Sequence, residues 1–154
     1  MLQKRKTRKR SASTPKKLTA AVIIPTRNRL NDLLTFIDSL AAQTIKPNEL
    51  IIVDSSDEPL INNAQFNKNF SEKNFPNIKL IYKHTDIPGA ARQRNVGTHL
   101  SEADIFYFFD DDSVLNKDYI LFFFQKYLSK KQIKNFCLCM ECYWFVCTCD
   151  YATE

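Results

Sequence analysis

Apolar runs that alternate with helix-like segments are the feature that most constrains how this chain can fold. Short β-branched runs, such as "TAAVIIP" at 19–25 and "ELIIVD" at 49–54, indicate strands buried on both faces of a sheet. Between them, apolar residues recur at helical spacing from Leu30 to near Gln43. This order predicts right-handed β-α-β units, because two parallel strands need a crossover connection.

The same alternation continues along the chain. We expect further strands at 77–84 and 104–112, a helix at 90–103, and a last helix with an apolar stripe that starts at Ile120. The prediction is an α/β domain with a mostly parallel, Rossmann-like sheet that is flanked by helices.

Two of the expected helices carry local signals of their own. Asn31 and Asp32 are placed to cap the first helix and to put negative charge at its N-terminus. The stretch from Pro59 to Lys73 is less periodic and predicts an irregular helix.

The positive charge is concentrated at the N-terminus. Residues 1–17 hold eight of the 22 Lys and Arg residues, and no acidic residue precedes Asp32. The remainder has 14 basic and 17 acidic residues, a net charge of −3. We interpret 1–17 as a disordered basic arm, with binding to anionic lipid or nucleic acid as the alternative.

The arm does not have the pattern of an export signal. It runs into Ser, Thr, Pro and Lys where a signal peptide needs an apolar stretch. No apolar run approaches the ~20 residues that span a bilayer. We therefore expect a cytoplasmic protein. The alternative is a protein that contacts the membrane surface through the basic arm.

A change of composition marks the C-terminus. All five cysteines lie between Cys137 and Cys149, in "CLCMECYWFVCTC", and the first 136 residues have none. Their spacing does not match the paired C-x2-C pattern of zinc sites. We predict that the chain divides into a domain at 18–134 and a Cys- and aromatic-rich tail at 135–154. The tail is either a buried strand with free thiols or a segment foreign to the domain.

Polar residues gather where the expected strands end. Ligands of open α/β sheets bind in the crevice outside the carboxyl ends of the strands. In this chain, that rule brings together Thr26, Arg27, Asn28, Arg29, Asp54, Ser55 and Asp110 to Asp112.

The crevice lacks the glycines of the common phosphate sites. The chain has only Gly89 and Gly97, and neither follows the first strand, which excludes a G-x-G-x-x-G site and a P-loop there. Three adjacent carboxylates repel one another and need a cation or open water. In an extended segment Asp110 and Asp112 would point the same way and Asp111 oppositely, which makes D-x-D a grip for Mg²⁺ or Mn²⁺. The alternative is an acidic turn in which Asp112 or Ser113 caps the next helix.

Four segments in this order resemble the family 2 glycosyltransferases: "VIIPTRNR", "LIIVDSS", "GAARQRNVG" and "FFDDDSVLNKDYI". The resemblance covers roughly 19–125. It implies a GT-A type fold in which the nucleotide-sugar-binding half comes first.

The resemblance also implies roles for individual residues. Nucleotide contacts are expected at Pro25, Thr26, Arg27, Asp54, Arg94, Asn95 and Asp110. Asp110 and Asp112 match the D-x-D element, which contacts the ribose and a diphosphate-bound Mn²⁺ or Mg²⁺. Gly97 completes the R-N-x-G element, and Arg92 is an additional cation without an assigned role.

The resemblance implies that a sugar is transferred, with inversion, from a nucleoside diphosphate sugar to the hydroxyl of an acceptor. We expect a UDP-linked donor. The acceptor, a sugar, a lipid-linked molecule or a polysaccharide, is unidentified. A carboxylate must act as general base. In the family that residue and the acceptor surface follow the D-x-D helix. Here only Glu141 and Asp150 are near that place, and neither has a matching context. The expectation is a truncated enzyme that keeps the donor half and is inactive alone.

Three other readings stay open on the sequence alone. A non-catalytic module that binds a nucleotide sugar would need no base. A nucleotidyltransferase would share the sheet and the metal, but "PTRNR" lacks the glycine-rich loop of that class. A nucleic-acid-binding protein needs positive charge and aromatic residues on one folded face, which an acidic domain does not favour.

Overall fold

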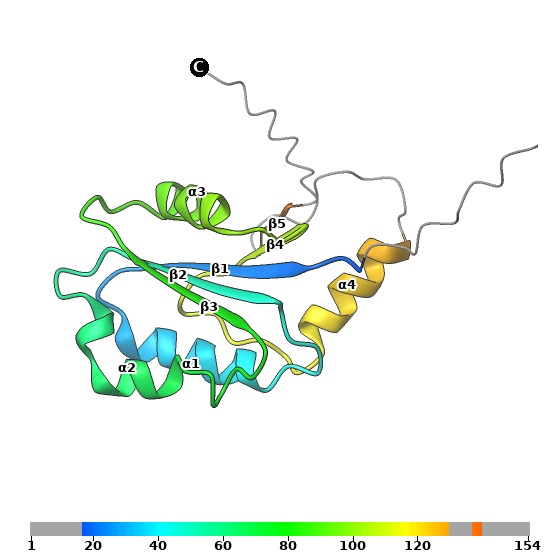
Figure 1. The fold of residues 1–154 in the computed structure, drawn as a ribbon, viewed down its shortest axis with the longest axis horizontal. Coiled ribbons are helices and arrows are strands. Elements are labelled where there is room, and N and C mark those ends of the chain that lie inside the picture. Colours follow the sequence, from blue (N-terminus) through cyan, green and yellow to red (C-terminus); the bar gives the residue numbers. More distant parts are fainter. Residues whose placement is uncertain (1–16, 130–136, 140–154) are drawn as a thin grey trace, which may run out of the picture.

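The structure is a computed structural model that describes residues 17–129 and 137–139 of the chain. Its elements alternate as the sequence predicts (Figure 1). In chain order they are β1 (Ala20–Thr26), α1 (Leu30–Ala41), β2 (Glu49–Asp54), the 3-10 helix η1 (Leu60–Asn62), α2 (Ala64–Asn69), β3 (Lys79–His84), α3 (Ala90–Leu100), β4 (Ile105–Phe108), α4 (Tyr119–Ser129) and β5 (Cys137–Cys139).

The strands form one parallel sheet in the order β3-β2-β1-β4-β5. Helices α1 and α2 lie on one face and α3 on the other (Figure 1). The predicted parallel sheet, flanked by helices, is confirmed. β1 lies at its centre, where Ile23 pairs with Ile51 of β2 and with Phe108 of β4.

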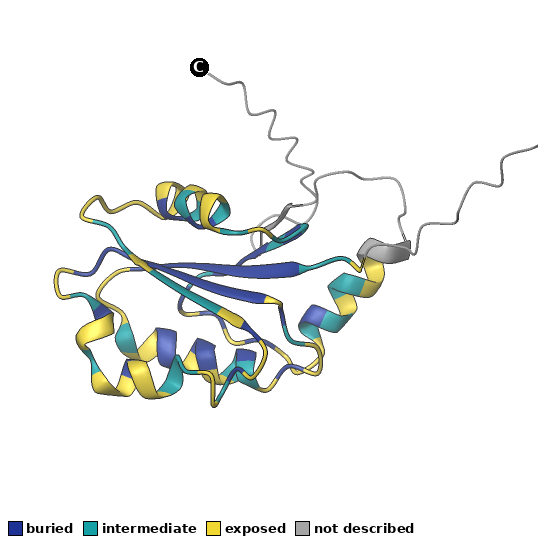
Figure 2. Cartoon of the chain, viewed as in Figure 1, coloured by how far each residue is buried: buried dark blue, intermediate teal, exposed yellow. Residues whose placement is uncertain are grey.

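Burial explains why the central strands read as continuous apolar runs. Every residue of β1 and β2 is buried (Figure 2). Val22 and Ile24 belong to the core under α1, whereas Ala21 and Ile23 belong to the core under α3. Alternate side chains of one strand therefore fill both layers, as a doubly covered parallel sheet requires.

Gly97 sets how closely α3 packs on the sheet. A Cβ built on this glycine would collide with Cγ2 of Ile23 in β1. The absence of a side chain thus lets the helix approach the central strand. The glycine of the R-N-x-G segment has a packing role in this structure.

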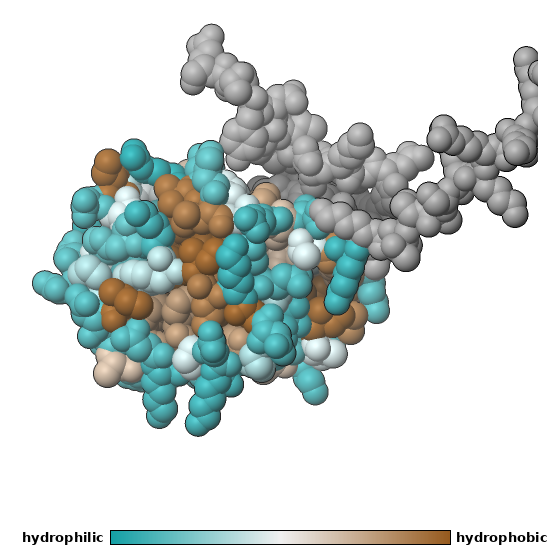
Figure 3. Space-filling model, viewed as in Figure 1, coloured by the Kyte–Doolittle hydropathy of each residue, from teal (hydrophilic) through white to brown (hydrophobic). Residues whose placement is uncertain are grey.

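Strand β3 is the edge of the sheet and is only partly buried. On the side of the molecule that Figure 3 shows, apolar residues gather between α3 and the layer of α1 and α2. The exposed Lys79 and Lys83 flank the partly buried Leu80 and Ile81. Charged side chains on an edge strand discourage pairing with a second chain.

Three local expectations differ from the structure. Asn31 does not cap α1, because the helix already begins at Leu30 and its N-cap is Arg29; Asp32 does lie in the first turn, as predicted. The irregular helix is split into η1 and α2, and α2 is capped by the Asn63 side chain, which accepts from the N–H groups of the second and third helical residues.

The third difference concerns β4, which ends at Phe108 and does not continue to Asp112. The partner strand limits it: β1 pairs with β4 only as far as Ile23, opposite Phe108. The aspartates therefore follow the strand and lie in a turn.

The basic arm lies outside the described residues apart from Lys17, and so does most of the cysteine-rich tail. Within that tail, Cys137–Cys139 forms β5, which pairs with β4. This agrees with a strand as one of the two alternatives for the segment. None of the helices that the structure describes is long and apolar enough to cross a bilayer.

We expect Tyr107→Phe to leave the fold intact and to raise the free energy of unfolding by up to about 1 kcal/mol. The Tyr107 hydroxyl is buried and has no hydrogen-bond partner among the described residues. Burial raises the pKa of Tyr107 to about 12. In the unfolded chain the Tyr107 hydroxyl ionises near its ordinary pKa of about 10. The free energy of unfolding therefore falls as the pH rises from about 10 to about 12.

Urea unfolding at about pH 8 and about pH 11 would measure this effect, and the variant should lose less stability between the two than the parent chain. Tyr82, whose pKa is also raised, stays in both proteins and contributes equally. A clear loss of stability in the variant at about pH 8 would mean that the hydroxyl has a partner outside the described residues.

Candidate functional site

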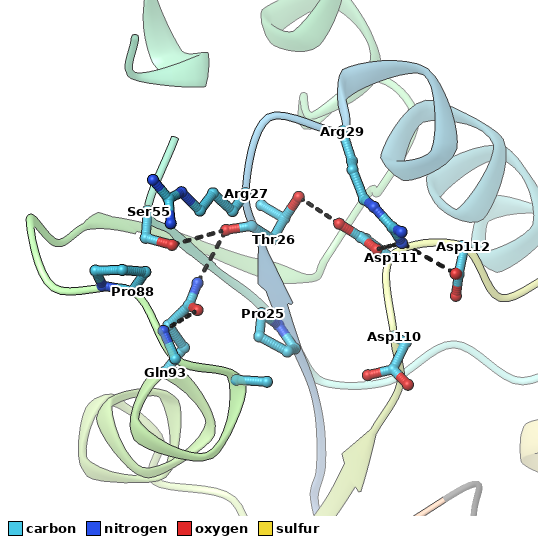
Figure 4. A pocket seen from close by; sticks show the side chains of 12 residues that line it. Pro25, Thr26, Arg27, Arg29, Ser55, Pro88, Gln93, Asp110, Asp111 and Asp112 are labelled. Atoms are coloured by element: carbon cyan, nitrogen blue, oxygen red, sulfur yellow. Dashed lines mark hydrogen bonds and ion pairs between the residues drawn. The ribbon is translucent and has the colours of Figure 1, made fainter. Parts of the chain in front are cut away.

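An open pocket of about 350 Å³ lies at the carboxyl edge of the sheet. It is formed by the loops after β1, β2 and β4 and by the turn before α3 (Figure 4). Its lining residues are Pro25, Thr26, Arg27, Arg29, Ser55, Pro88, Gly89, Ala90, Gln93, Asp110, Asp111 and Asp112. The crevice that the strand order predicts is therefore present.

Pro25 helps to open this edge. The carbonyl oxygen of Ile23 accepts from the N–H of Phe109, so this side of β1 faces β4. Pro25, two residues further along the strand, faces the same side but has no N–H to donate. The ladder to β4 has already ended at Ile23, so β1 and the chain after β4 can separate around the pocket.

The loop after β1 is tied to the loop after β2. Asn28 adopts a φ of 54°, a conformation that asparagine tolerates better than most residues. Its N–H donates to Ser56 Oγ at 2.8 Å and its Nδ2 donates to Asp57 Oδ2 at 2.8 Å. This local network positions Arg27 and Arg29 beside the pocket, while Asn28 itself is not one of the lining residues.

The three aspartates do not alternate as an extended segment would. Asp111 is buried and accepts from Thr26 Oγ1 at 2.7 Å, and it also accepts from Arg29 at 3.3 Å. Asp112 accepts from the same Arg29 nitrogen at 3.0 Å, so these two neighbours converge on one guanidinium (Figure 4). The expected opposite direction of Asp111 is wrong because the strand ends before it and the chain turns.

Arginine side chains supply the cations that three adjacent carboxylates need. Hydrogen bonds to Asp111 and Asp112 raise the pKa of Arg29 further above its already high ordinary value. Arg94 of α3 forms a short ion pair with Asp110 Oδ1. The aspartate cluster is therefore compensated from two sides, by the loop after β1 and by α3.

Asp54 is fully buried and does not line the pocket. Its Oδ1 accepts from the N–H of Ser56 at 2.8 Å. Its Oδ2 accepts from the N–H of Leu60 at 2.9 Å and from the Tyr82 hydroxyl at 2.6 Å. In this structure Asp54 organises the loop after β2, and the lining residue from that loop is Ser55. Its contact with a nucleotide base stays a prediction.

Of the expected site residues on α3, neither Arg94 nor Asn95 lines the pocket. Arg94 reaches the site through Asp110. Asn95 is exposed, and its carbonyl oxygen accepts from Thr98 and contacts the ring of His99. Arg92 is exposed on the same helix.

The sequence did not single out Gln93 or the turn Pro88–Ala90 as lining residues. Gln93 is 3% exposed and bonds to backbone groups of three segments. The only sign of Gln93 in the sequence was a polar residue on the side of the helix that is expected to be buried. The Pro88–Gly89 pair does mark a turn, and Gly89 adopts a φ of 145°, which favours glycine.

The donor chemistry of this edge suits a hard divalent cation. Asp110 and Asp112 are 39% and 57% exposed at the side chain, and each uses one carboxylate oxygen in its contact with arginine. Magnesium often takes only one or two protein carboxylates. Within the described part of the chain, however, no group of three or more His, Cys, Asp or Glu side chains is arranged to hold a metal ion. A cation here would need oxygen atoms from a ligand or water.

Comparison with known proteins agrees with the fold. Solved structures of TarS from S. aureus are similar: residues 1–349 in complex with UDP match with a TM-score of 0.57 and 24% identity over 73% of this chain and 32% of that chain. The complex with UDP-GlcNAc matches with a TM-score of 0.55 at the same identity and coverage. The likeness confirms the GT-A type of fold.

A curated relative is an uncharacterized glycosyltransferase from Haemophilus influenzae, 34% identical over 93 residues. The match covers 60% of this chain and 29% of the relative, so the chain spans about a third or less of the length of the proteins it matches. Residues 21–132 match the family described as glycosyl transferase family 2. The chain therefore belongs to glycosyl transferase family 2.

Proposed function

We propose that this chain binds the donor of a metal-dependent, inverting glycosyltransferase: a nucleoside diphosphate sugar, with UDP as the nucleotide. One observation carries the proposal. In a member of this family, the loop after β1 and the Asp110–Asp112 turn line the same open pocket at the carboxyl edge of the sheet.

The size and charge of the pocket suit such a ligand. About 350 Å³ lies within the range of small-molecule sites. Two arginines and three aspartates line it, and Arg94 stands behind Asp110. Arg29 and Arg94 already pair with these aspartates, and Arg27 pairs with Asp57 beside the pocket. The pocket therefore offers little net positive charge to a diphosphate. A divalent cation would supply it.

The residues divide into two groups along the pocket. Pro25, Thr26 and Arg27, together with Ser55, form the side that would hold the base and ribose. Asp110 and Asp112 form the other side and would hold Mn²⁺ or Mg²⁺, which supplies charge stabilisation for a departing diphosphate when bound. Asp111 is bonded to Thr26 and thereby links the two sides.

The comparison with solved structures also supports this assignment. The related structures of TarS were solved with UDP and with UDP-GlcNAc, which favours a UDP-linked donor for this chain as well. The general base and the acceptor remain unassigned, because Glu141 and Asp150 lie outside the described residues. Transfer to an acceptor is therefore the part of the proposal that rests on the family alone.

The test is calorimetric titration of UDP, UDP-sugars and UMP into the intact chain, with Mn²⁺ present or chelated. We expect UDP to bind at least about tenfold more tightly with Mn²⁺, because the cation bridges carboxylates and diphosphate. UMP, which has one phosphate, should gain much less from the metal. A folded chain that binds none of these ligands would contradict the proposal.

The same titration, extended to nucleoside triphosphates and combined with an assay of sugar transfer to acceptors, separates the competing functions. Metal-dependent UDP-sugar binding without transfer to any acceptor would favour the non-catalytic module. Tighter binding of nucleoside triphosphates than of UDP would favour a nucleotidyltransferase.

A further inference from the structure

The buried side chain of Gln93 joins three segments of the chain at the pocket. It lies on the first turn of α3 and is 3% exposed. Its Nε2 donates to the carbonyl oxygen of Thr26 at 2.9 Å and to that of Val53 at 2.7 Å. Its Oε1 accepts from the N–H of Gly89 at 3.3 Å. One amide therefore joins the ends of β1 and β2 to the turn before α3.

The orientation of this amide follows from its partners. Carbonyl oxygens only accept hydrogen bonds, so the nitrogen of the side chain must face Thr26 and Val53. The backbone N–H of Gly89 only donates, so the oxygen must face the turn. The side chain can make all three hydrogen bonds at once only in this orientation.

The groups that Gln93 joins include pocket walls. Thr26, Gly89, Ala90 and Ser55 line the pocket. The N–H of Ser55 donates to the same Thr26 carbonyl at 3.0 Å, and its hydroxyl donates to it at 3.4 Å (Figure 4). The main-chain N–H of Gln93 also donates to the Gly89 carbonyl at 2.8 Å. The backbone of Gln93 thus ties the turn to α3, and its side chain holds the turn against the sheet.

We propose that Gln93 is a positioning residue that sets the distance between the turn at Pro88–Ala90 and the ends of β1 and β2, and so shapes the site for a nucleoside diphosphate. This inference rests on the proposed function for its ligand. Gln93 acts through the backbone of Thr26 and Gly89, because both polar ends of its side chain are already bonded to protein.

The test compares Gln93→Leu with Asn48→Ala in the full chain. Asn48 is a matched control: its side-chain oxygen accepts from the N–H of Ala20 at 2.8 Å and joins β1 to the loop before β2, at the opposite edge of the sheet. We expect Gln93→Leu to weaken UDP binding in the presence of Mn²⁺ by at least about tenfold. Asn48→Ala should lower the melting temperature and leave UDP affinity within about twofold of the parent chain.

Amide hydrogen exchange gives a second readout that needs no ligand. In Gln93→Leu, exchange should become faster at 26–29, 54–57 and 88–91, while the amino ends of the strands keep their protection. If exchange rises equally over the whole sheet, Gln93 is only a stabilising residue and the proposal is wrong. If the parent chain does not bind UDP, the proposed function fails, yet the exchange pattern still decides the role of Gln93.

Gln93→Glu keeps the length of the side chain and covers the case in which Gln93→Leu does not fold. The carboxylate can still accept from the N–H of Gly89 but cannot donate to the two carbonyl oxygens. Exchange should therefore rise more at 26–29 and 54–57 than at 88–91. Equal protection of all three segments in this variant, with unchanged UDP affinity, would overturn the proposal.

Discussion

Replacing Asp54 with alanine is expected to lower the free energy of unfolding by about 3–5 kcal/mol. The carboxylate is fully buried and accepts three hydrogen bonds, from the N–H groups of Ser56 and Leu60 and from the Tyr82 hydroxyl. Alanine would leave two buried N–H groups and the partly buried Tyr82 hydroxyl without their acceptor, and each unsatisfied buried donor costs about 1–3 kcal/mol.

The loss would be large for a domain of this size, because the whole stability of a small protein is about 5–15 kcal/mol. Burial and the hydrogen bond to Asp54 raise the pKa of Tyr82, so its phenol remains a neutral donor at physiological pH. Tyr82→Phe removes only this one bond and should cost about 1 kcal/mol. The two variants together separate what the Tyr82 hydroxyl and the two backbone N–H groups each contribute to the free energy of unfolding through Asp54.

Asp57→Ala is the matched control, three residues further along the same loop. Its side chain is 74% exposed and contacts Arg27 and Asn28, and exposed ion pairs contribute about 0–1 kcal/mol. Urea unfolding of the three variants at neutral pH measures the difference. If Asp54→Ala were as stable as Asp57→Ala but bound UDP much more weakly, Asp54 would be a ligand-binding residue and not the organiser of its loop.

The sequence predicted the fold well because burial on both faces leaves a plain pattern. β1 and β2 are buried at every position, so their runs are continuously apolar, and the helix between them alternates at helical spacing. The limits of β4 were harder to predict. Phe109 is still buried, and only the pairing with β1, which the sequence does not state, ends the strand at Phe108.

The site was predicted less completely, for a related reason. Residues at strand ends could be placed by topology, and Pro25, Thr26, Arg27 and Asp110 do line the pocket. The direction of a side chain in a turn could not be predicted, so Asp111 was placed in the crevice but its bond to Thr26 was missed. The role of Gln93 depends on carbonyl oxygens from two strands, and no local pattern encodes such long-range partners.

The double variant Asp110→Asn, Asp112→Asn is expected to abolish the gain in UDP affinity that Mn²⁺ provides. Both carboxylates are partly exposed at the pocket, and each has one oxygen outside its contact with arginine. Two lost charged ligands correspond to about 3 kcal/mol or more, which is about a 100-fold loss of metal-dependent affinity. Calorimetric titration of UDP with Mn²⁺ and with a chelator measures both affinities in each protein.

Binding without metal should respond in the opposite direction, and this makes the variant informative. Removing two negative charges releases Arg94 from Asp110 and leaves Arg29 with Asp111 alone. The pocket then becomes more positive, so UDP should bind in chelator at least as tightly as it does to the parent chain. A loss of affinity under both conditions would instead indicate a disturbed pocket, which the melting temperature would reveal.

Asp32→Asn, Asp38→Asn changes the net charge by the same amount on the exposed face of α1 and serves as the control. Its metal-dependent affinity should match that of the parent chain, because neither residue lines the pocket. If the Asp110 and Asp112 variant kept the full gain from Mn²⁺, the cation would have to bind elsewhere. The arginine pairs would then be the permanent counterions of the aspartate cluster, and the site would hold its diphosphate without a metal on these carboxylates.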